Sequence, residues 1–333
     1  MVAFDELVMD LCLAEAWRYQ GLTYPNPAVG AAVVKNGRIL SIAAHKRAGG
    51  PHAEVEAIKD AYYMLTQDEK ILACTEADAL HAYLQRHCGD LFYDATIYVT
   101  LEPCAHFGKT PPCMLLLHSL GFKRIVIGTR DPHAKASGGA SYLRSRGVEV
   151  HLGIRQKECE DLIEPFVRWM HERFIFFKFA QTLNGNITQG TISSLASRKF
   201  VHALRDRIDL LVIGGNTVRL DRPILDARLV QGRAPDVLIY TRKKDFDTHI
   251  PLFNIPHRKV YQEDTLDRLQ DYRFIMIEGG ESMLRATKDI VDWYLVFLAP
   301  MSRNGCNYAF DASMEFLHHT KIDRDLVIWS RNG

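Results

Sequence analysis

One histidine and two cysteines are spaced so that they could bind a metal ion together. His52 lies in the run from Pro51 to Ala57, and Cys104 and Cys113 follow later in the chain with eight residues between them. Imidazole and thiolate groups are ligands that zinc prefers, and three protein ligands leave the fourth position of a tetrahedral site open for water. These side chains therefore predict a catalytic zinc site.

A carboxylate lies two residues after the predicted histidine ligand. In the first turn of a helix, this spacing lets His52 hold the metal while Glu54 reaches the water in the open position. Zinc lowers the pKa of such a water from about 15.7 to about 7. One His and two Cys on zinc, with a Glu that transfers protons, is the residue set of zinc-dependent nucleobase deaminases. We expect Glu54 to be catalytic and the target to be a ring carbon that carries an amino group.

Each of these residues also has an ordinary structural explanation. A His-x-Glu sequence occurs by chance in many proteins, and a free cysteine is commonly a small buried hydrophobe. The joint occurrence of His52, Cys104 and Cys113, with Pro103 before the first cysteine, favours the zinc site. The remaining cysteines are expected to be packing residues: Cys12, Cys74, Cys88, Cys159 and Cys306.

The composition predicts two domains and excludes several classes of protein. A chain of 333 residues exceeds the size at which one core usually keeps growing. Forty-one basic and forty acidic residues give a net charge of +1, which argues against a nucleic-acid-binding editor or structural module. No apolar run is long enough to cross a membrane, and no signal peptide is recognised. The odd, unevenly spaced cysteines indicate a reducing compartment, so we expect a cytoplasmic protein, with oligomeric state left open.

Helices and strands alternate in the first half, with the predicted ligands at strand ends and helix starts. This order indicates a layered α/β domain whose site lies at the carboxyl edge of the sheet. Residues 65–93 read as a polar, helical insertion of unknown purpose. The other predicted elements are helices over 4–19, 51–64, 112–120 and 140–145, and strands over 29–34, 39–44, 95–101, 124–128 and 148–152.

Two strands of the second half end in glycine pairs. Gly214-Gly215 follows a buried strand over 210–213, and Gly279-Gly280 follows another over 274–277. A glycine turn before a helix can bind phosphate; taken alone, Gly214-Gly215 is better explained by a tight turn, and close strand-helix packing is the alternative for Gly279-Gly280. Further strands are predicted over 174–180, 237–241, 292–299 and 326–330, a helix over 197–205, and weak helix and loop patterns over 242–272.

Three runs of residues resemble the bifunctional riboflavin-biosynthesis deaminase-reductase family. They are residues 25–30 (PNPAVG), 48–54 (AGGPHAE) and 100–113 (TLEPCAHFGKTPPC). The gap of eight residues between the cysteines is that of this family, whereas nucleoside and tRNA deaminases typically have two. The resemblance implies hydrolytic deamination of 2,5-diamino-6-(5-phosphoribosylamino)pyrimidin-4(3H)-one, a small phosphorylated pyrimidine. NADPH-dependent reduction of the ribosyl side chain to ribityl would follow.

The resemblance also implies the fold and the division of the chain. Residues 1–150 would form a cytidine-deaminase-like three-layer α/β/α domain, and residues 174–333 a dihydrofolate-reductase-like α/β domain, with residues 151–173 as a bridging helix. Periodicity alone does not distinguish the second fold from a Rossmann sheet. Zn²⁺ and NADPH are the implied cofactors.

Several residues would contact substrate or cofactor if the resemblance holds. In the first half these are Asn26, which could equally be a turn residue, His45, either a solvated loop residue or a donor at the pocket edge, and Lys109, placed to meet the substrate phosphate. The reductase substrate would contact Arg205, Leu225, Arg228 and Glu278. The cofactor would contact Ala180, Thr217, Asp221, Thr241 and Gly280.

The second half departs from the family pattern at several positions. Asn184 and Arg222 stand where the family usually has aspartates; in the first half, His133 begins a departure from the usual Asn-Pro after Asp131-Pro132. Residues 186–196 are short and lack the Ser-x-Trp-Ile-Thr pattern of the family, offering Thr191-Ile192-Ser193 instead. The alternative interpretation is therefore an active deaminase with a weakened or lost reductase half.

Overall fold

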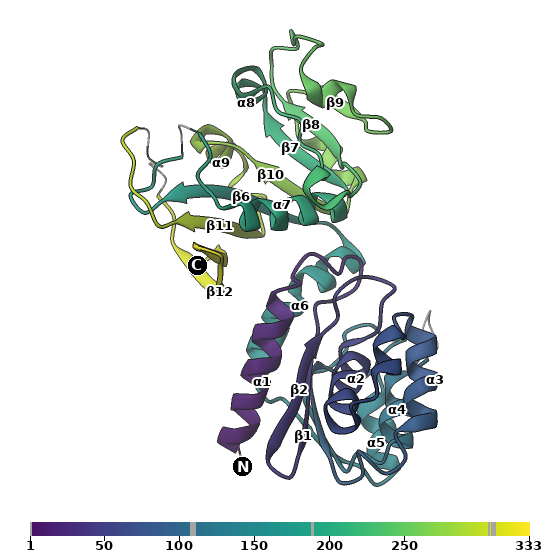
Figure 1. Ribbon diagram of the computed structural model, residues 1–333. Helices are drawn as coiled ribbons and strands as arrows, with labels where there is room; N and C mark the ends of the chain where they lie inside the picture. Colours follow the sequence, from purple (N-terminus) through teal and green to yellow (C-terminus); the bar gives the residue numbers. More distant parts are fainter. Residues whose placement is uncertain (1, 107–110, 188–189, 306, 308–310) are drawn as a thin grey trace. The chain divides into compact units, whose positions relative to one another are not determined.

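The chain divides into two compact units, residues 1–167 and residues 168–333, each built on its own sheet (Figure 1). The structure is a computed structural model, and it describes residues 2–106, 111–187, 190–305, 307 and 311–333. Within these residues no helix is both long enough and apolar enough to cross a membrane.

The first unit contains a five-stranded sheet in the order β2-β1-β3-β4-β5. β1 pairs antiparallel with β2 and β3, whereas β3, β4 and β5 are parallel. Asn36 and Gly37 turn β1 into β2 with φ values of 53° and 71°, the positive values that a tight hairpin turn requires. The strands are β1 (Gly30–Lys35), β2 (Arg38–Ala44), β3 (Thr96–Leu101), β4 (Arg124–Thr129) and β5 (Glu149–Leu152).

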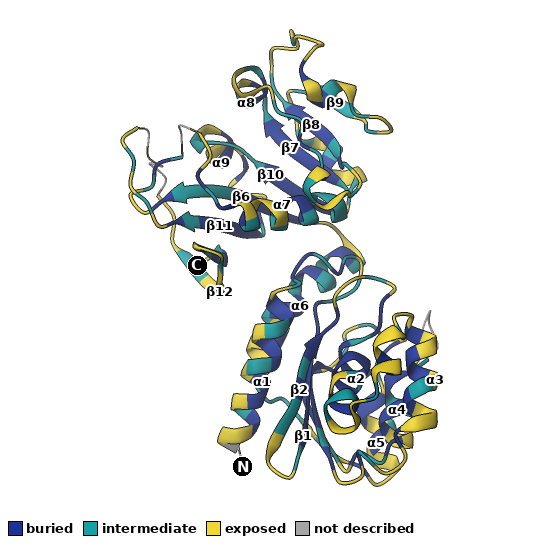
Figure 2. Cartoon of the chain, in the orientation of Figure 1, coloured by how far each residue is buried: buried dark blue, intermediate teal, exposed yellow. Residues whose placement is uncertain are grey.

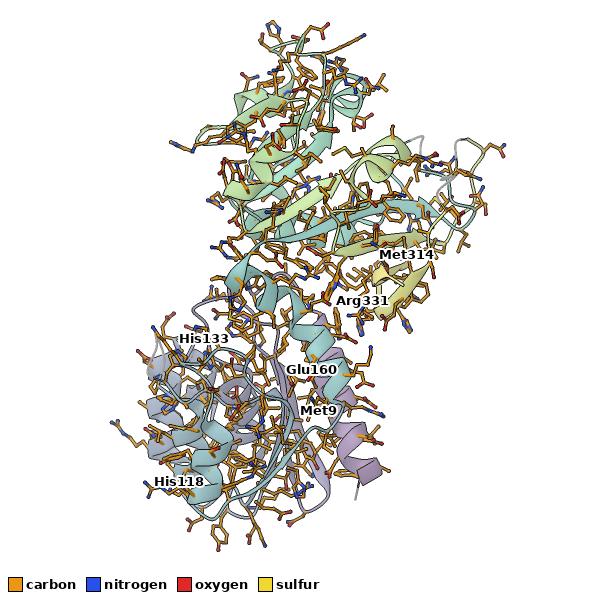
Figure 3. The ribbon with its side chains drawn as sticks, turned by 180° about the vertical axis from the view of Figure 1, so that it is seen from behind. Met9, His118, His133, Glu160, Met314 and Arg331 are labelled. Carbon is orange, nitrogen blue, oxygen red and sulfur yellow. The ribbon has the colours of Figure 1, made fainter. Side chains whose placement is uncertain are left out.

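Helices cover both faces of this sheet and confirm the predicted three-layer arrangement. Figure 1 shows α1 (Val2–Trp17) and α6 (Gln156–His171) on one face, and Figure 3 labels Met9 and Glu160 on these two helices. The opposite face carries α2 (Ala53–Thr66), α3 (Ala77–His87), α4 (Cys113–Ser119) and α5 (Gly139–Ser145). A Cβ on Gly30 would lie 2.0 Å from the Cys12 carbonyl oxygen, so the missing side chain lets α1 pack directly on β1.

The insertion over residues 65–93 belongs to the core of the first unit. It folds as a 3-10 turn over Glu69–Ala73 followed by α3. Ile71, Leu80 and Leu84 are fully buried in the same cluster as the residues of α2 and α4. The segment therefore extends the helical layer and buries apolar surface, which stabilises that face.

The second unit contains an eight-stranded sheet in the order β12-β13-β11-β6-β10-β7-β8-β9. The strands from β11 to β9 are parallel, and β12 and β13 form an antiparallel hairpin. Figure 2 shows the first residues of the central strands β6, β10 and β7 as buried, as is usual in parallel sheets, and the carboxyl-terminal half of β6 as only partly buried. The strands are β6 (Phe174–Thr182), β7 (Leu210–Gly214), β8 (Asp236–Tyr240), β9 (Val260–Glu263), β10 (Phe274–Glu278), β11 (Trp293–Ala299), β12 (Met314–Ile322) and β13 (Asp325–Asn332).

A buried carboxylate fixes the start of α7 (Leu195–Arg207). Asp325 Oδ2 accepts hydrogen bonds from the Ser194 N-H at 2.7 Å and the Ser197 hydroxyl at 2.6 Å. Ser194 Oγ in turn accepts from the Ser197 N-H, which satisfies a free donor of the first turn. The other helices of this unit are α8 (Gly215–Asp221) and α9 (Glu281–Thr287), with 3-10 turns at Arg228–Val230, Pro251–Asn254 and Asp267–Asp271.

Two strands lie where the sequence did not predict them. The prediction of weak helix and loop structure over 242–272 is wrong at Val260–Glu263, because these residues form β9. The strand β12 was not predicted at all. Both are the outermost strands of the sheet. An edge strand pairs with a neighbouring strand on one side alone, so its residues are partly exposed and its sequence lacks a strong apolar pattern.

Candidate zinc and substrate sites

The three predicted metal ligands converge in the first unit. His52 Nδ1 lies 3.7 Å from Cys104 Sγ and 3.3 Å from Cys113 Sγ, and all three atoms lie within 4.8 Å of one another. Zinc bonds of about 2.05 Å to nitrogen and 2.3 Å to sulfur, at a tetrahedral angle, place N and S about 3.6 Å apart. The two N-S distances lie on either side of this value, so the side chains fit a zinc ion.

Two helix starts and one strand end bring the ligands together. His52 is the residue before α2 and has extended backbone, and its carbonyl accepts the Glu56 N-H at 3.0 Å. Cys113 is the first residue of α4, and Cys104 follows the end of β3. The Cys113 N-H points at Cys104 Sγ, 3.3 Å away. This contact fixes the Cys104 side chain to the backbone at the start of α4, where Cys113 lies.

The electrostatics of the two thiols also suit a cation. Hydrogen bonding with Cys113 and His52 lowers the pKa of Cys104 to about 4, despite burial. The same contact with Cys104 raises the pKa of Cys113 well above its usual range. Two buried thiols this close do not both ionise alone, because the second thiolate would meet the charge of the first. A bound dication would offset the repulsion between the two thiolates, so this set of ligands fits a zinc ion.

Glu54 lies in the first turn of α2 and is buried. Only 4% of its surface is exposed, and this burial raises the pKa of its carboxyl to about 7. A carboxyl with a pKa near neutrality can both accept and donate a proton at working pH. Glu54 and His52 face the same cavity of about 480 Å³. The predicted proton-transfer residue is therefore beside the metal ligands.

Two of the predicted contacts to the deaminase substrate, Asn26 and His45, also line this cavity. Asn26 Nδ2 lies 3.1 Å from His45 Nε2, and both residues belong to the cavity wall. His45 is only 3% exposed, so it is not a solvated loop residue. Asp131 and His133, the latter labelled in Figure 3, complete the wall on the side of the loop after β4. Lys109 lies outside the described residues.

Glu102 is a structural member of the site that the sequence did not single out. Its carboxylate accepts hydrogen bonds from the backbone N-H groups of Asp131 at 3.3 Å, Gly138 at 3.2 Å and Ala140 at 2.9 Å. It therefore holds the loop that carries Asp131 into the cavity wall. Its place immediately before Pro103 and Cys104 was the available indication.

A second cluster of charged residues lies at the carboxyl edge of the sheet in the second unit. Arg205 Nη2 lies 3.1 and 3.0 Å from the two carboxylate oxygens of Glu278, and Lys178 Nζ lies 3.9 Å from Oε1. Although burial opposes ionisation, Arg205 and Lys178 hold the pKa of Glu278 below its usual range. Burial lowers the pKa of Lys178, and the attraction of Glu278 opposes this shift.

The other predicted substrate residues of this unit lie around that cluster. Arg228 is exposed and donates to Asp226 Oδ1 at 2.6 Å, while the Asp226 carbonyl accepts from Arg205 at 3.4 Å. Leu225 is buried, has a positive φ of 58°, and its carbonyl accepts from Arg258 at 2.8 Å. The side chain of Leu225 thus packs inward, and its backbone turns the chain just before Asp226 and Arg228.

Most of the predicted cofactor residues lie in or just after the carboxyl-terminal parts of neighbouring parallel strands. Ala180 lies on β6, Gly280 follows β10, Thr217 follows β7 and Thr241 follows β8. Gly215 lets β7 and β8 end close together, since a Cβ there would lie 2.5 Å from Thr241 Oγ1. Asp221, at the end of α8, is exposed.

The positions that depart from the family pattern have partners within the second unit. Arg222 donates to Asp247 Oδ2 at 2.7 Å, and Asn184 Oδ1 accepts from the Thr182 hydroxyl at 2.6 Å. A Cβ on Gly280 would lie 3.7 Å from Ile187 Cδ1, so Ile187 borders the turn that was expected to meet the cofactor.

Comparison with known proteins matches each unit to a family. Residues 2–129 match the model of the cytidine and deoxycytidylate deaminase zinc-binding region. Residues 173–328 match that of the RibD C-terminal domain. A riboflavin biosynthesis protein RibD of Synechocystis is 34% identical over 274 residues, which span 79% of this chain and 67% of that protein. The chain belongs to the RibD family.

Other RibD proteins extend the comparison along the chain. The RibD of Aquifex aeolicus is 37% identical over 256 residues, which cover 74% of this chain and 64% of the relative. The RibD of Mycobacterium tuberculosis is 29% identical over 330 residues, which cover 93% of this chain and 88% of the relative. The matched stretch therefore spans just under two thirds of the first relative and most of the second.

Solved RibD structures share the fold of the whole chain. A diaminohydroxyphosphoribosylaminopyrimidine deaminase/5-amino-6-(5-phosphoribosylamino)uracil reductase of Thermotoga maritima is 27% identical with a TM-score of 0.67. The alignment covers 100% of this chain and 99% of that one. Acinetobacter baumannii RibD, with 22% identity and a TM-score of 0.66, supports the fold alone. The predicted resemblance and fold class are confirmed.

Proposed function

We propose that the protein performs two successive steps of riboflavin biosynthesis. The first unit would deaminate 2,5-diamino-6-(5-phosphoribosylamino)pyrimidin-4(3H)-one by hydrolysis, and the second would reduce the ribosyl side chain of the product to ribityl with NADPH. The observation that carries the proposal is the convergence of His52, Cys104 and Cys113 beside the buried Glu54, at a cavity that His52, Cys104 and Glu54 line.

Glu54 moves the protons of the proposed deamination. A zinc ion held by His52, Cys104 and Cys113 would supply a Lewis acid that activates water at neutral pH. The Glu54 carboxylate accepts one proton from the attacking water and donates it to the ring nitrogen. It then transfers the second proton to the departing amino group, so that water and the C-NH₂ group become a carbonyl and ammonia. Its pKa of about 7 suits both transfers.

The charges of the second cluster support a phosphorylated sugar as the second ligand. Lys178 and Arg205 together carry two positive charges against the single negative charge of Glu278. Arg228, exposed and only two residues from its partner Asp226, can turn toward a phosphate. Arginine forms strong paired hydrogen bonds with phosphate oxygens. In this assignment Glu278 orients Arg205 and contacts the ribosyl hydroxyls.

The strand ends beside this cluster support a nicotinamide cofactor. In open parallel sheets, ligands bind outside the carboxyl ends of the strands, where Ala180, Thr217, Thr241 and Gly280 lie. Among the described residues, a Cβ on Gly280 would meet Ile187 alone, at 3.7 Å, which leaves room beside this turn for a ligand group. NADPH bound there would supply a hydride to the sugar carbon. Ile187 would then border the cofactor in the segment that lacks the family tryptophan.

Two assays with the full chain test this proposal. Purified protein is incubated with the diaminopyrimidinone phosphate while released ammonia is measured, and the deaminated product is then followed with NADPH at the nicotinamide absorbance band. We expect both ammonia release and a decrease in absorbance. Absence of ammonia would contradict the deaminase assignment. Ammonia release without NADPH oxidation would instead support the alternative of a lost reductase activity.

We further propose that the enzyme acts in the cytoplasm, since a reducing compartment keeps thiol ligands such as Cys104 and Cys113 available to a metal. The sequence leaves the oligomeric state open between a single chain and a homo-oligomer, and light scattering on the purified chain would distinguish the two.

A further inference from the structure

A chain of hydrogen bonds connects the residue before the first zinc ligand to the side chain of Asn26. His45 Nδ1 lies 2.8 Å from the carbonyl oxygen of Pro51, and His45 Nε2 lies 3.1 Å from Asn26 Nδ2. Pro51 immediately precedes His52. His45 is buried, and its ring also makes an edge contact with the ring of His52 at 5.7 Å between centroids.

The partners of His45 determine which of its nitrogens carries the proton. A carbonyl oxygen can only accept a hydrogen bond, so Nδ1 must donate to Pro51. The amide nitrogen of Asn26 can only donate, so Nε2 must accept from it. Both bonds are satisfied at once by the neutral ring with its proton on Nδ1. A hydrogen bond of this kind commonly fixes the tautomer of a histidine.

The same contacts determine which way the Asn26 amide points. With Nδ2 held by His45, Oδ1 is the remaining hydrogen-bonding atom of a side chain that lines the 480 Å³ cavity. Among the described residues none donates to Oδ1. The backbone of Asn26 is also fixed, because its N-H donates to the Thr23 carbonyl at 2.8 Å and its carbonyl accepts from the Thr23 hydroxyl at 2.9 Å.

We infer that His45 is a positioning residue that holds the Asn26 amide with Oδ1 toward the cavity, where it accepts a hydrogen bond from an N-H group of the pyrimidine. This inference rests on the proposed deaminase function. The proposed substrate offers such a donor at its ring N-H. An oxygen in a fixed position favours a ring edge that carries a hydrogen, and rejects one that presents only a lone pair, because the acceptor would then stay unpaired.

The arrangement also links the residue that would bind the pyrimidine to the segment that carries the metal ligand His52. Asn26 would bind one edge of the ring, while the Pro51 carbonyl, two bonds away along the hydrogen-bond chain, begins the segment that carries His52 and Glu54. The orientation of Asn26 is therefore fixed, through His45, by the same backbone segment that positions the Glu54 carboxylate. Positioning of this kind contributes to affinity because an acceptor that is already oriented loses little freedom when the ring binds.

Replacement of His45 by glutamine or phenylalanine separates positioning from packing. The His45→Gln side chain retains one donor for Pro51 and one acceptor for Asn26, whereas His45→Phe fills the space but offers neither. We expect His45→Phe to raise the KM for deamination about tenfold, the value of one lost hydrogen bond, with kcat less affected. We expect His45→Gln to restore most of the affinity, and both variants to keep the parental zinc content.

A double-mutant cycle with Asn26→Ala shows whether His45 acts through Asn26. We expect Asn26→Ala to raise KM by a similar factor, and the double variant Asn26→Ala/His45→Phe to resemble Asn26→Ala alone, because coupled residues are not additive. Full additivity of the two losses, or an unchanged KM in His45→Phe, would overturn the inference. Equal failure of His45→Gln and His45→Phe would also overturn it, since it would indicate a packing role only.

An NMR measurement tests the tautomer independently of activity. In protein labelled with ¹⁵N at histidine, we expect His45 to show a protonated Nδ1 and an unprotonated Nε2 near neutral pH, assigned by the loss of its signals in His45→Gln. A protonated Nε2 would contradict the inference. If the parental protein shows this tautomer but releases no ammonia from the diaminopyrimidinone, the proposed function fails while the orientation of Asn26 stands.

Discussion

Arg205 and Glu278 come from different elements of the second unit and form a two-bond ion pair. Arg205 lies near the end of α7 and Glu278 ends β10, and their hydrogen bonds measure 3.1 and 3.0 Å. Both side chains are largely shielded from water, so the pair is screened little by salt. The helix is held at its other end by Asp325, which makes the position of Arg205 a property of the fold.

Replacement of Arg205 by alanine should weaken the reductase and spare the deaminase. The change removes a cation proposed to bind the phosphorylated sugar and leaves Glu278 paired only with the more distant Lys178. We expect a decrease in kcat/KM for NADPH oxidation of about 10- to 100-fold, the value of lost charge-assisted bonds. Ammonia release should stay at the parental rate. Both rates are measured on the same preparation.

Arg207→Ala is the matched control for this variant. Arg207 lies two residues further along α7, is more exposed, and pairs with Asp206 at 3.1 Å. It should leave both activities within about twofold, since surface ion pairs contribute little. An equal loss of deamination and reduction in Arg205→Ala would show that the two sites are not separate.

Glu54→Gln should retain zinc and lose deamination. The amide has nearly the same shape as the carboxylate but cannot transfer protons, and His52, Cys104 and Cys113 are unchanged. We expect kcat for ammonia release to fall about 10²- to 10⁴-fold. The control is Glu56→Gln on the same helix, whose carboxylate pairs with Lys46 at 3.0 Å and does not line the cavity. Parental turnover in Glu54→Gln would exclude Glu54 as the proton-transfer residue.

Asp5→Asn should destabilise the first unit at neutral pH but not in acid. Hydrogen bonds from Arg124, at 2.9 and 2.7 Å, lower the pKa of Asp5 in the folded protein. A lowered folded pKa stabilises the protein above the unfolded pKa of about 3.9, and this stability is lost as the pH falls through the folded value. We expect a loss of about 1–3 kcal/mol near pH 7 that shrinks below about pH 4.

Urea unfolding over this pH range measures the effect, with the transition of the first unit assigned by hydrogen exchange of α1. Asp10→Asn is the control, because Asp10 lies on the same helix and pairs with Arg155 at 2.9 Å, but in an exposed position. It should cost less than about 1 kcal/mol at any pH. A pH-independent loss in Asp5→Asn would show that packing, rather than charge, is responsible.

Much of the fold and of the metal site could be predicted from local patterns. The hairpin at Asn36-Gly37 has the dipeptide that positive φ values require, and the buried central strands are continuous apolar runs. The ligand set could be predicted because His52, Cys104 and Cys113 belong to short motifs whose spacing is itself informative. In the hairpin and the strands the physical requirement falls on residues that are near in sequence, whereas the metal ligands, 52 and 61 residues apart, could be predicted because each lies in a motif of its own.

Other features depend on partners that are distant in sequence. β12 pairs only with β13, so Phe316 stays exposed and the strand lacks a strong apolar pattern. The orientation of Asn26 depends on His45 and Pro51, and the loop around Asp131 depends on Glu102. A polar side chain in isolation does not reveal its partner, so these roles emerged only when the chain was seen folded.

Zinc content measured together with ammonia release tests the central claim most directly. Cys104→Ala removes one ligand of the cluster, and Cys88→Ala, a buried cysteine outside it, is the control. We predict about one zinc per chain in the parental protein and in Cys88→Ala, both active, and loss of zinc together with loss of ammonia release in Cys104→Ala. Parental deamination by metal-free Cys104→Ala would contradict the account.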